Sequence, residues 1–162
     1  MIRRYYRQSN EEYSRNLINR RDLAELSILC VDDVEENLLV LRRMLKIIGV
    51  NDVRIATTGT EALGIVEDRA PDIIITDLWM PGMNGFVFAQ AVAAVPRIPE
   101  IRLIALTADT MAVENRACLK IFEQILVKPA TIMKLSEVIS SRPAFNPHRL
   151  QDLNRQSEIC SA

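Results

Sequence analysis

Two short apolar segments of this sequence end on aspartates, and this feature restricts the fold more than any other. Residues 26–31 run directly into Asp32 and Asp33, and a second apolar segment, 72–77, ends on Asp77. Short apolar runs of this kind suit strands that are buried on both faces, as in parallel sheets. Carboxylates at the ends of two such strands predict a polar site at one edge of the sheet.

Segments with helical spacing alternate with the predicted strands along the chain. We predict strands at residues 26–31, 53–55, 72–77, 101–107 and 122–127. We predict helices at residues 38–48, 60–68, 84–95, 110–120 and 131–141, with Gly49 ending the first. Alternating strands and helices require right-handed crossovers. The fold class is therefore α/β, with a doubly wound, five-stranded parallel sheet that carries helices on both faces.

The predicted strands and helices occupy residues 25–141, and the flanking segments differ from them in composition. Residues 1–24 are polar and Arg-rich, and they contain no glycine or proline. Their few apolar residues can line one face of a short helix: Leu17, Ile18 and Leu23. This helix is either solvated or loosely docked, or it binds a partner or forms a dimer. Residues 142–162 have little apolar periodicity and are predicted to be a flexible tail.

Charge and composition argue against several classes of protein. Among 162 residues the formal net charge is −1, so no overall field attracts nucleic acid or a membrane surface. No apolar stretch approaches the length of a transmembrane helix, and the N-terminus lacks the apolar core of a signal peptide. The three cysteines lie far apart, as expected of reduced thiols: Cys30, Cys118 and Cys160. A cytoplasmic location is expected.

Residues with chemical potential follow four of the predicted strands. Asp32 and Asp33 follow the first, Asp77 ends the third, Thr107 ends the fourth and Lys128 follows the fifth. In open α/β sheets, ligands bind beyond the carboxyl ends of the strands. Three crowded carboxylates repel one another, and a Mg²⁺ ion with oxygen ligands relieves that conflict.

A carboxylate beside a divalent cation and a lysine can accept a phosphoryl group. Phosphoryl transfer depends mainly on positioning and on charge neutralisation. Asp77 would attack the phosphorus atom, while Mg²⁺ and Lys128 would neutralise charge on two sides. The Thr107 hydroxyl would then donate a hydrogen bond to a phosphoryl oxygen.

Four motifs together resemble those of response-regulator receiver domains in two-component signalling. They are Val-Asp-Asp at 31–33, Asp-Leu-Trp-Met-Pro-Gly-Met-Asn-Gly at 77–85, Ala-Leu-Thr-Ala at 105–108 and Lys-Pro at 128–129. The likeness extends over residues 26–141 with the motifs in the right order. Asn37 and the 105–108 motif are most similar to receivers attached to hybrid histidine kinases.

This resemblance implies a flavodoxin-like strand order of 2-1-3-4-5 and specific roles in the site. Asp77 is the implied phosphoacceptor, Thr107 the switch hydroxyl and Lys128 the phosphate partner. The implied Mg²⁺ ligands are the carboxylates of Asp32, Asp33 and Asp77 and the backbone carbonyl of Trp79. Asp32 would act directly or through water.

The same resemblance implies how the whole domain would function. The domain would catalyse its own phosphorylation and dephosphorylation and would have no other enzymatic activity. A histidine kinase or a histidine phosphotransfer protein would donate the phosphoryl group. The phosphorylated domain would then bind a downstream protein target or form a homodimer. Trp79 and Asp109 would modulate the lifetime of the phosphoryl group, and the Lys128–Pro129 bond would be cis. The family usually has an aromatic ring where this chain has Ile125, so the usual readout is in question.

Each candidate residue also has a structural interpretation. Asp33, with Glu36 three residues later, can cap a helix. Asp77 can form an Asx-type turn. Thr107 can cap the next helix, and Lys128 can be an exposed charge at a strand end. All four structural interpretations would have to apply at the same time at one edge of the sheet. Because this requires four independent coincidences, the functional interpretation is favoured.

Three other functions remain as alternatives. Phosphatases with an aspartyl nucleophile carry a second aspartate two residues later, where this chain has Trp79. A receiver-like adaptor that never receives phosphate is the second alternative, and a fragment of a hybrid histidine kinase is the third. His148 is the only histidine and lies in the tail, so the phosphoryl group must come from another protein or a small donor.

Overall fold

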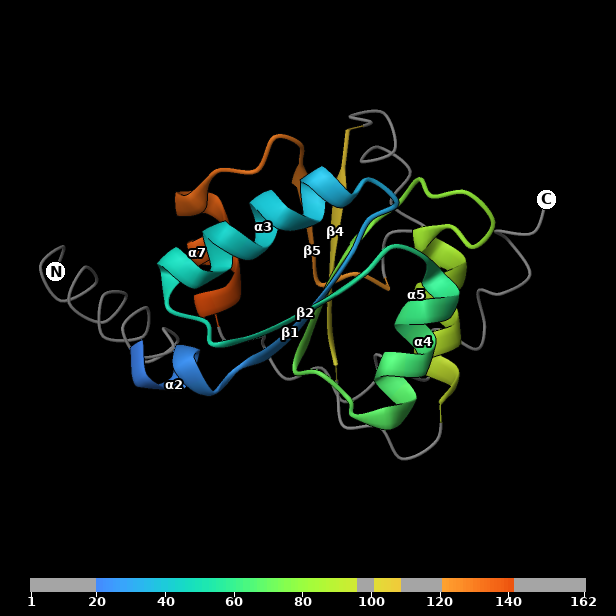
Figure 1. Ribbon diagram of the computed structural model, residues 1–162, viewed down its shortest axis with the longest axis horizontal. Coiled ribbons are helices and arrows are strands. Elements are labelled where there is room, and N and C mark those ends of the chain that lie inside the picture. Colours follow the sequence, from blue (N-terminus) through green and yellow to red (C-terminus); the bar gives the residue numbers. More distant parts are fainter. Residues whose placement is uncertain (1–19, 96–100, 109–120, 142–162) are drawn as a thin grey trace, which may run out of the picture.

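The computed structural model describes residues 20–95, 101–108 and 121–141, and its centre is a parallel five-stranded sheet (Figure 1). The strands are β1 Ser27–Val31, β2 Asp52–Ala56, β3 Ile73–Asp77, β4 Arg102–Thr107 and β5 Gln124–Val127. They lie in the order β2-β1-β3-β4-β5. Every adjacent pair is parallel. The predicted fold class and strand order are therefore confirmed.

Helices cover both faces of this sheet. They are α2 Arg20–Glu25, α3 Glu35–Ile48, α4 Gly59–Asp68, α5 Gly85–Ala94 and α7 Ile132–Ser140. In Figure 1, α3 and α7 lie on one side of the sheet, and α4 and α5 lie on the other. The helix predicted at 110–120 lies outside the described residues, as do the predicted tail and most of the N-terminal extension.

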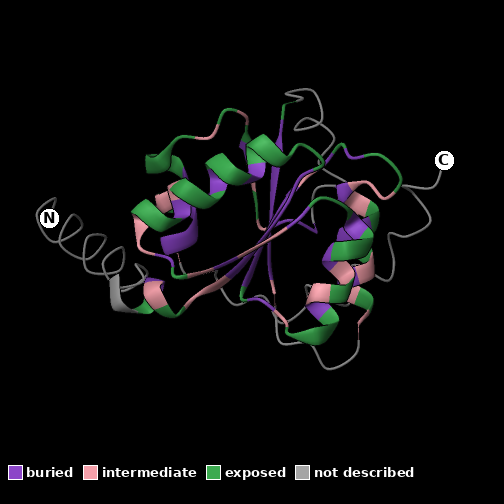
Figure 2. Cartoon of the chain, in the orientation of Figure 1, coloured by how far each residue is buried: buried purple, intermediate pink, exposed green. Residues whose placement is uncertain are grey.

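Two apolar clusters separate the sheet from its two helical layers. Ile28 and Cys30 of β1 face the cluster that contains the apolar stripes of α3 and α7. Leu29 and Val31, the alternate residues of the same strand, face the cluster that includes α4 and α5. Alternate side chains of a strand point to opposite faces, which explains this division. The buried central strands and the exposed outer sides of the helices are visible in Figure 2.

Local signals in the sequence set the ends of the helices. Gly49 ends α3 with φ 114°, a left-handed conformation that a residue with a side chain adopts at a cost. The N-caps of α4, α5 and α7 are Thr58, Asn84 and Thr131, and each side chain accepts a hydrogen bond from the amide three residues later. These caps fix where the helices begin relative to the sheet edge.

The last part of the N-terminal extension contacts the domain. Leu23 of α2 is only 5% exposed and belongs to the apolar cluster under α3 and α7. A fully solvated helix is therefore excluded for residues 20–25. Among the described residues, no helix has the length and apolar character that a membrane span requires.

Candidate functional site

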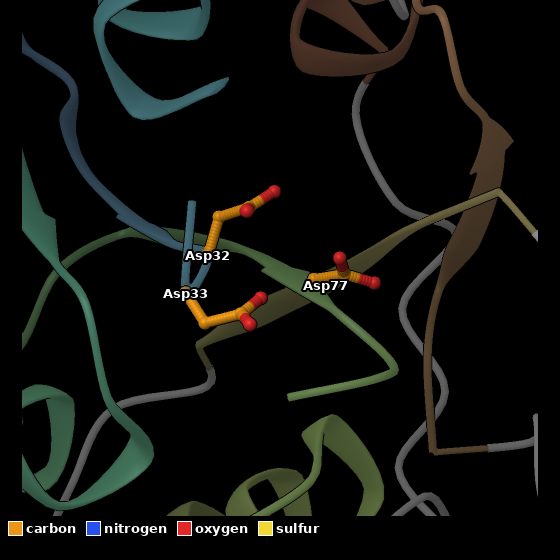
Figure 3. A group of neighbouring side chains, drawn as sticks. All are labelled: Asp32, Asp33 and Asp77. Atoms are coloured by element: carbon orange, nitrogen blue, oxygen red, sulfur yellow. The ribbon is translucent and has the colours of Figure 1, made fainter. Parts of the chain in front are cut away.

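Three carboxylates meet beyond the carboxyl ends of β1 and β3. Asp32 and Asp33 follow β1, and Asp77 is the last residue of β3. One oxygen from each carboxylate lies within 4.8 Å of the others. Asp32 is buried, Asp77 is half-buried and Asp33 is exposed. Figure 3 shows the two neighbouring side chains pointing in different directions, with Asp77 across from them on its own strand. The predicted convergence of these residues is confirmed.

The ammonium group of Lys128 joins two of these carboxylates. Its Nζ lies 2.6 Å from Oδ2 of Asp32 and 2.6 Å from Oδ2 of Asp77. The backbone amide of Lys128 donates to the carbonyl of Thr107 at 2.8 Å, and the Lys128–Pro129 bond is cis, as predicted. The side chain is only 19% exposed. The alternative of an exposed strand-end charge is therefore wrong for Lys128.

The surroundings of Lys128 favour its charged form. Burial lowers the pKa of the ammonium, but hydrogen bonds and charge attraction from Asp32 and Asp77 outweigh this effect. The net result is a pKa for Lys128 above its ordinary value. Lys128 is therefore a permanent positive charge at neutral pH, placed between two carboxylates.

Asp32 is held in place by the start of α3. Its Oδ1 accepts the backbone amide of Val34 at 2.9 Å. The side-chain amide of Asn37 donates to Oδ1 at 3.0 Å and to Oδ2 at 3.2 Å. The N-cap of α3 is Val34, without a side-chain cap, so the alternative of Asp33 as the capping residue is wrong. Asp33 is thus left exposed with its oxygens available.

The turn after Asp77 fixes the backbone around the acceptor. The backbone amide of Trp79 donates to Asp77 Oδ1 at 3.1 Å, so the Asx-type turn is present as well as the ion pair of Oδ2 with Lys128. The turn closes where Gly85 donates to the carbonyl of Leu78 at 3.0 Å. A Cβ atom on Gly85 would lie 2.2 Å from the carbonyl oxygen of Asp77. This position therefore excludes every other amino acid unless the turn moves.

Thr107 and Ile125 lie on the neighbouring strands. Thr107 is the last residue of β4 and is fully buried. Ile125 pairs in register with Ala105 and packs against the apolar cluster of the α4 and α5 face. Ile125 therefore packs inward, but its side chain is aliphatic and lacks the aromatic ring that the family usually has at this position.

Trp79 begins a row of aromatic rings next to the site. Trp79 is 55% exposed. The ring contacts Phe86 edge-on with centroids 6.5 Å apart, and Phe86 contacts Phe122 at 5.8 Å in the same way. The row extends from the acceptor turn to Phe122, two residues before β5.

The donor set of the site suits a hard divalent cation. Asp33 is exposed, and the carboxylates of Asp32 and Asp77 stand beside it. Mg²⁺ prefers such carboxylate oxygens and keeps several waters, which an exposed site allows. The residues present therefore fit this ion. Whether the Trp79 carbonyl is a further ligand stays a prediction, as does the metal role of each carboxylate.

Two residues of the site have roles that the sequence did not predict. Asn37 stands out in the sequence only for its likeness to hybrid-kinase receivers, and Gly85 only as the end of a motif. The signal for Asn37 is its place on the first turn of a helix that begins beside Asp32. The predicted lifetime residue Asp109 and the tail residue His148 lie outside the described residues.

Comparison with known proteins agrees with this geometry. "Sensor protein GacS" of Pseudomonas syringae pv. syringae is 33% identical over 69% of this chain, and "Aerobic respiration control sensor protein ArcB" of Escherichia coli K12 is 30% identical over 72%. The chain covers only 13% and 15% of these proteins.

A solved structure is similar in both sequence and fold. It is the receiver domain of sensor histidine kinase PA1611 from Pseudomonas aeruginosa PAO1, whose active-site cleft coordinates a magnesium ion. It is 26% identical, with a TM-score of 0.64, over 70% of this chain and 93% of that structure. The family model of the response regulator receiver domain matches residues 28–140. This chain belongs to the response regulator receiver domain family of two-component signalling.

Proposed function

We propose that this protein is a phosphorylation-switched signalling module that accepts a phosphoryl group on Asp77 in the presence of Mg²⁺. The observation that carries the proposal is the position of Lys128 Nζ, 2.6 Å from Asp77 Oδ2, beside three carboxylates that fit one cation. A nucleophile, a fixed positive charge and a metal site at one sheet edge are the parts that phosphoryl transfer requires.

The proposed step is a direct displacement on phosphorus. A carboxylate oxygen of Asp77 forms a bond to the phosphorus atom of a phosphohistidine. The phosphorus–nitrogen bond breaks, and its electron pair stays with the leaving imidazole of the donor. Lys128 would release Asp32 and Asp77 and pair with the phosphoryl oxygens, and the buried hydroxyl of Thr107 would donate to one of them.

Asp33 and Asp77 would hold the metal, with Asp32 nearby. Bound Mg²⁺ supplies charge neutralisation for the phosphoryl oxygens. We infer no enzymatic activity beyond this self-catalysed acceptance and the later hydrolysis. The donor would be a histidine kinase or a histidine phosphotransfer protein, because relatives such as GacS and ArcB are sensor proteins. Output through a downstream protein target, a homodimer and a cytoplasmic location belong to the same proposal.

Intact-protein mass spectrometry after incubation with acetyl phosphate and Mg²⁺ tests the proposal. Wild type should gain the mass of one phosphoryl group, and hydroxylamine should remove it, as expected of an acyl phosphate. Asp77→Asn should gain nothing. Asp72→Asn is the matched control, because Asp72 is an exposed aspartate that binds the Ser27 amide at the opposite end of β1. A wild-type protein that stays unmodified, or an adduct that persists in Asp77→Asn, would contradict the proposal.

One observation favours a second candidate, a receiver-like adaptor that works without phosphate. Ile125 has no ring or hydroxyl to report a movement of Thr107, although it packs on the same cluster as α4 and α5. The two candidates differ in a partner-binding assay with beryllofluoride. Binding that responds to beryllofluoride supports the phosphorylation switch, and binding of equal strength with Asp77→Asn and without the anion supports the adaptor.

A further inference from the structure

Asp32 and Asp33 are neighbours in sequence, but their oxygens are in opposite situations. The Asp32 carboxylate accepts four hydrogen bonds, one from Val34, two from Asn37 and one from Lys128. An ionised carboxylate has about four lone-pair positions, so Asp32 is filled with protein donors. Within the described ranges, the Asp33 carboxylate accepts no hydrogen bond from a side chain or from the backbone.

The donors to Asp32 differ in how easily they can leave. Val34 and Asn37 belong to the start of α3, where the backbone amide of Asn37 donates to the Val34 carbonyl at 3.0 Å. Lys128 instead reaches the site on a long, flexible side chain from the end of β5 and also contacts Asp77. The bond from Lys128 is therefore the one that exchanges when a ligand arrives, while the bonds from α3 stay.

Asn37 makes the only side-chain bridge in the described structure across both oxygens of Asp32. A carboxylate accepts and cannot donate, so the NH₂ end of the Asn37 side chain must face it. A bridge across both oxygens fixes the plane of the carboxylate as well as its position. The bridge carries no charge, so it orients Asp32 without cancelling the negative charge that attracts a cation.

We propose that Asn37 is a positioning residue that fixes the Asp32 carboxylate and thereby sets the Mg²⁺ affinity of the site. Asp33 and Asp77 would contact the ion directly, while Asp32 would act from behind them by orienting bound water at the position that Lys128 vacates. Groups that orient the surroundings of a metal in this way typically change its affinity by about 10–100-fold when removed. This inference rests on the proposed Mg²⁺ site and adds a residue that governs it.

The test compares Mg²⁺ binding by wild type with Asn37→Leu, which keeps the shape of the side chain and removes both donors. Binding is measured by Trp79 fluorescence and, independently, by the rise of the melting temperature with Mg²⁺ concentration. We expect the Kd to rise about tenfold in Asn37→Leu. Asn37→Gln keeps the amide and should recover part of the affinity. Gln90→Leu removes an amide from an exposed position of α5 and should bind as wild type does.

A split in the phosphorylation rates separates positioning from a general structural effect. With Asn37→Leu, the rate from acetyl phosphate should fall at low Mg²⁺ and approach the wild-type rate when Mg²⁺ saturates. If Asn37→Leu does not fold, Asn37→Ser, whose shorter side chain cannot bridge both oxygens, takes its place. An unchanged Kd in the folded variant overturns the inference. A phosphorylation rate of the variant that stays below the wild-type rate at saturating Mg²⁺ also overturns the inference.

Failure of this inference is distinguishable from failure of the proposed function. If wild type takes up phosphate and Asn37→Leu has the same Kd for Mg²⁺ as wild type, only the role of Asn37 is contradicted. If wild type binds Mg²⁺ but takes up no phosphate, only the proposed function is contradicted. A wild-type protein without any response to Mg²⁺ would overturn both.

Discussion

The ammonium of Lys128 lies 2.6 Å from a carboxylate oxygen of Asp77, although 51 residues separate the two in sequence. The same ammonium lies 2.6 Å from Asp32, which is 96 residues away. Three strand ends of one sheet therefore converge on a single positive charge. Removing that charge would leave the carboxylates of Asp32 and Asp77 without the positive charge that they share.

Lys128→Gln should lower the free energy of unfolding by about 2 kcal/mol in Mg²⁺-free buffer at neutral pH, because Asp32 and Asp77 lose their shared partner. Adding Mg²⁺ should recover part of the loss. Urea unfolding of the two proteins, with and without the ion, measures both effects. Lys134→Gln is the control, since Lys134 forms only an exposed pair with Glu137. Equal loss in the two variants would contradict this account.

The raised pKa of Lys128 predicts how the same difference depends on pH. A lysine whose pKa is higher in the folded state stabilises the fold fully below its unfolded pKa of about 10.4. That stability is lost as the pH rises through the folded pKa. The gap in urea midpoint between wild type and Lys128→Gln should therefore stay constant from pH 7 to about 9.5 and shrink above about 10.4. A gap that stays level into strong alkali would contradict the assigned direction.

Gly85 and Gly64 should respond in opposite ways to the same substitution. Gly85→Ala places a Cβ 2.2 Å from the carbonyl oxygen of Asp77 and should destabilise the protein by about 2 kcal/mol or more. Gly64 lies on the exposed side of α4, and a Cβ atom there would meet nothing within 4 Å, so Gly64→Ala should stabilise by about 0.5–1 kcal/mol. Thermal unfolding measures the stability of both variants. A destabilised Gly64→Ala or an unaffected Gly85→Ala would contradict this prediction.

Arg102 forms a buried ion pair at the other end of the sheet. It pairs with Glu123 at 2.7 Å and donates to the carbonyls of Val138 and Ile139, so it joins β4 to the residue before β5 and to the end of α7. Arg102→Met should cost about 3–5 kcal/mol, because it leaves a buried carboxylate and two carbonyls without this donor.

Arg69→Met is the matched control for this ion pair. Arg69 pairs with Asp52 in an exposed position, and its loss should cost at most about 1 kcal/mol. Denaturant unfolding gives both values. Similar costs for the two variants would show that burial of the Arg102 pair contributes little.

Trp79 should report the state of the site by fluorescence. It is the only tryptophan, it lies two residues after Asp77, and its ring contacts Phe86. Mg²⁺ and then beryllofluoride should each produce a saturable change in emission. Asp33→Asn should weaken the response to Mg²⁺, and Asp77→Asn should abolish the response to beryllofluoride. A wild-type protein whose emission ignores both additions would contradict the site as described.

Much of the fold was predictable because its signals are local. The apolar runs before Asp32 and Asp77 identify buried strands, and Gly49 ends its helix in a backbone conformation that favours glycine. The family resemblance implied the strand order, which the structure confirms. The convergence of Asp32, Asp33, Asp77 and Lys128 was predictable because the carboxyl ends of parallel strands lie at one edge of the sheet. The family resemblance added the cis bond before Pro129, which the structure confirms.

The individual partners of these residues depended on tertiary structure. The sequence allowed Asp33 to be a helix cap and left Asn37 without a role, whereas in the fold Val34 is the N-cap and Asn37 binds Asp32. It likewise left Arg102 inside an apolar strand without its partner Glu123. Which side chains gather at the sheet edge can be read from the amino-acid sequence, because strand alternation and chain direction are local properties. Which oxygen accepts which donor becomes visible in the folded chain alone, because hydrogen bonds depend on distances and angles between segments that are remote in the chain.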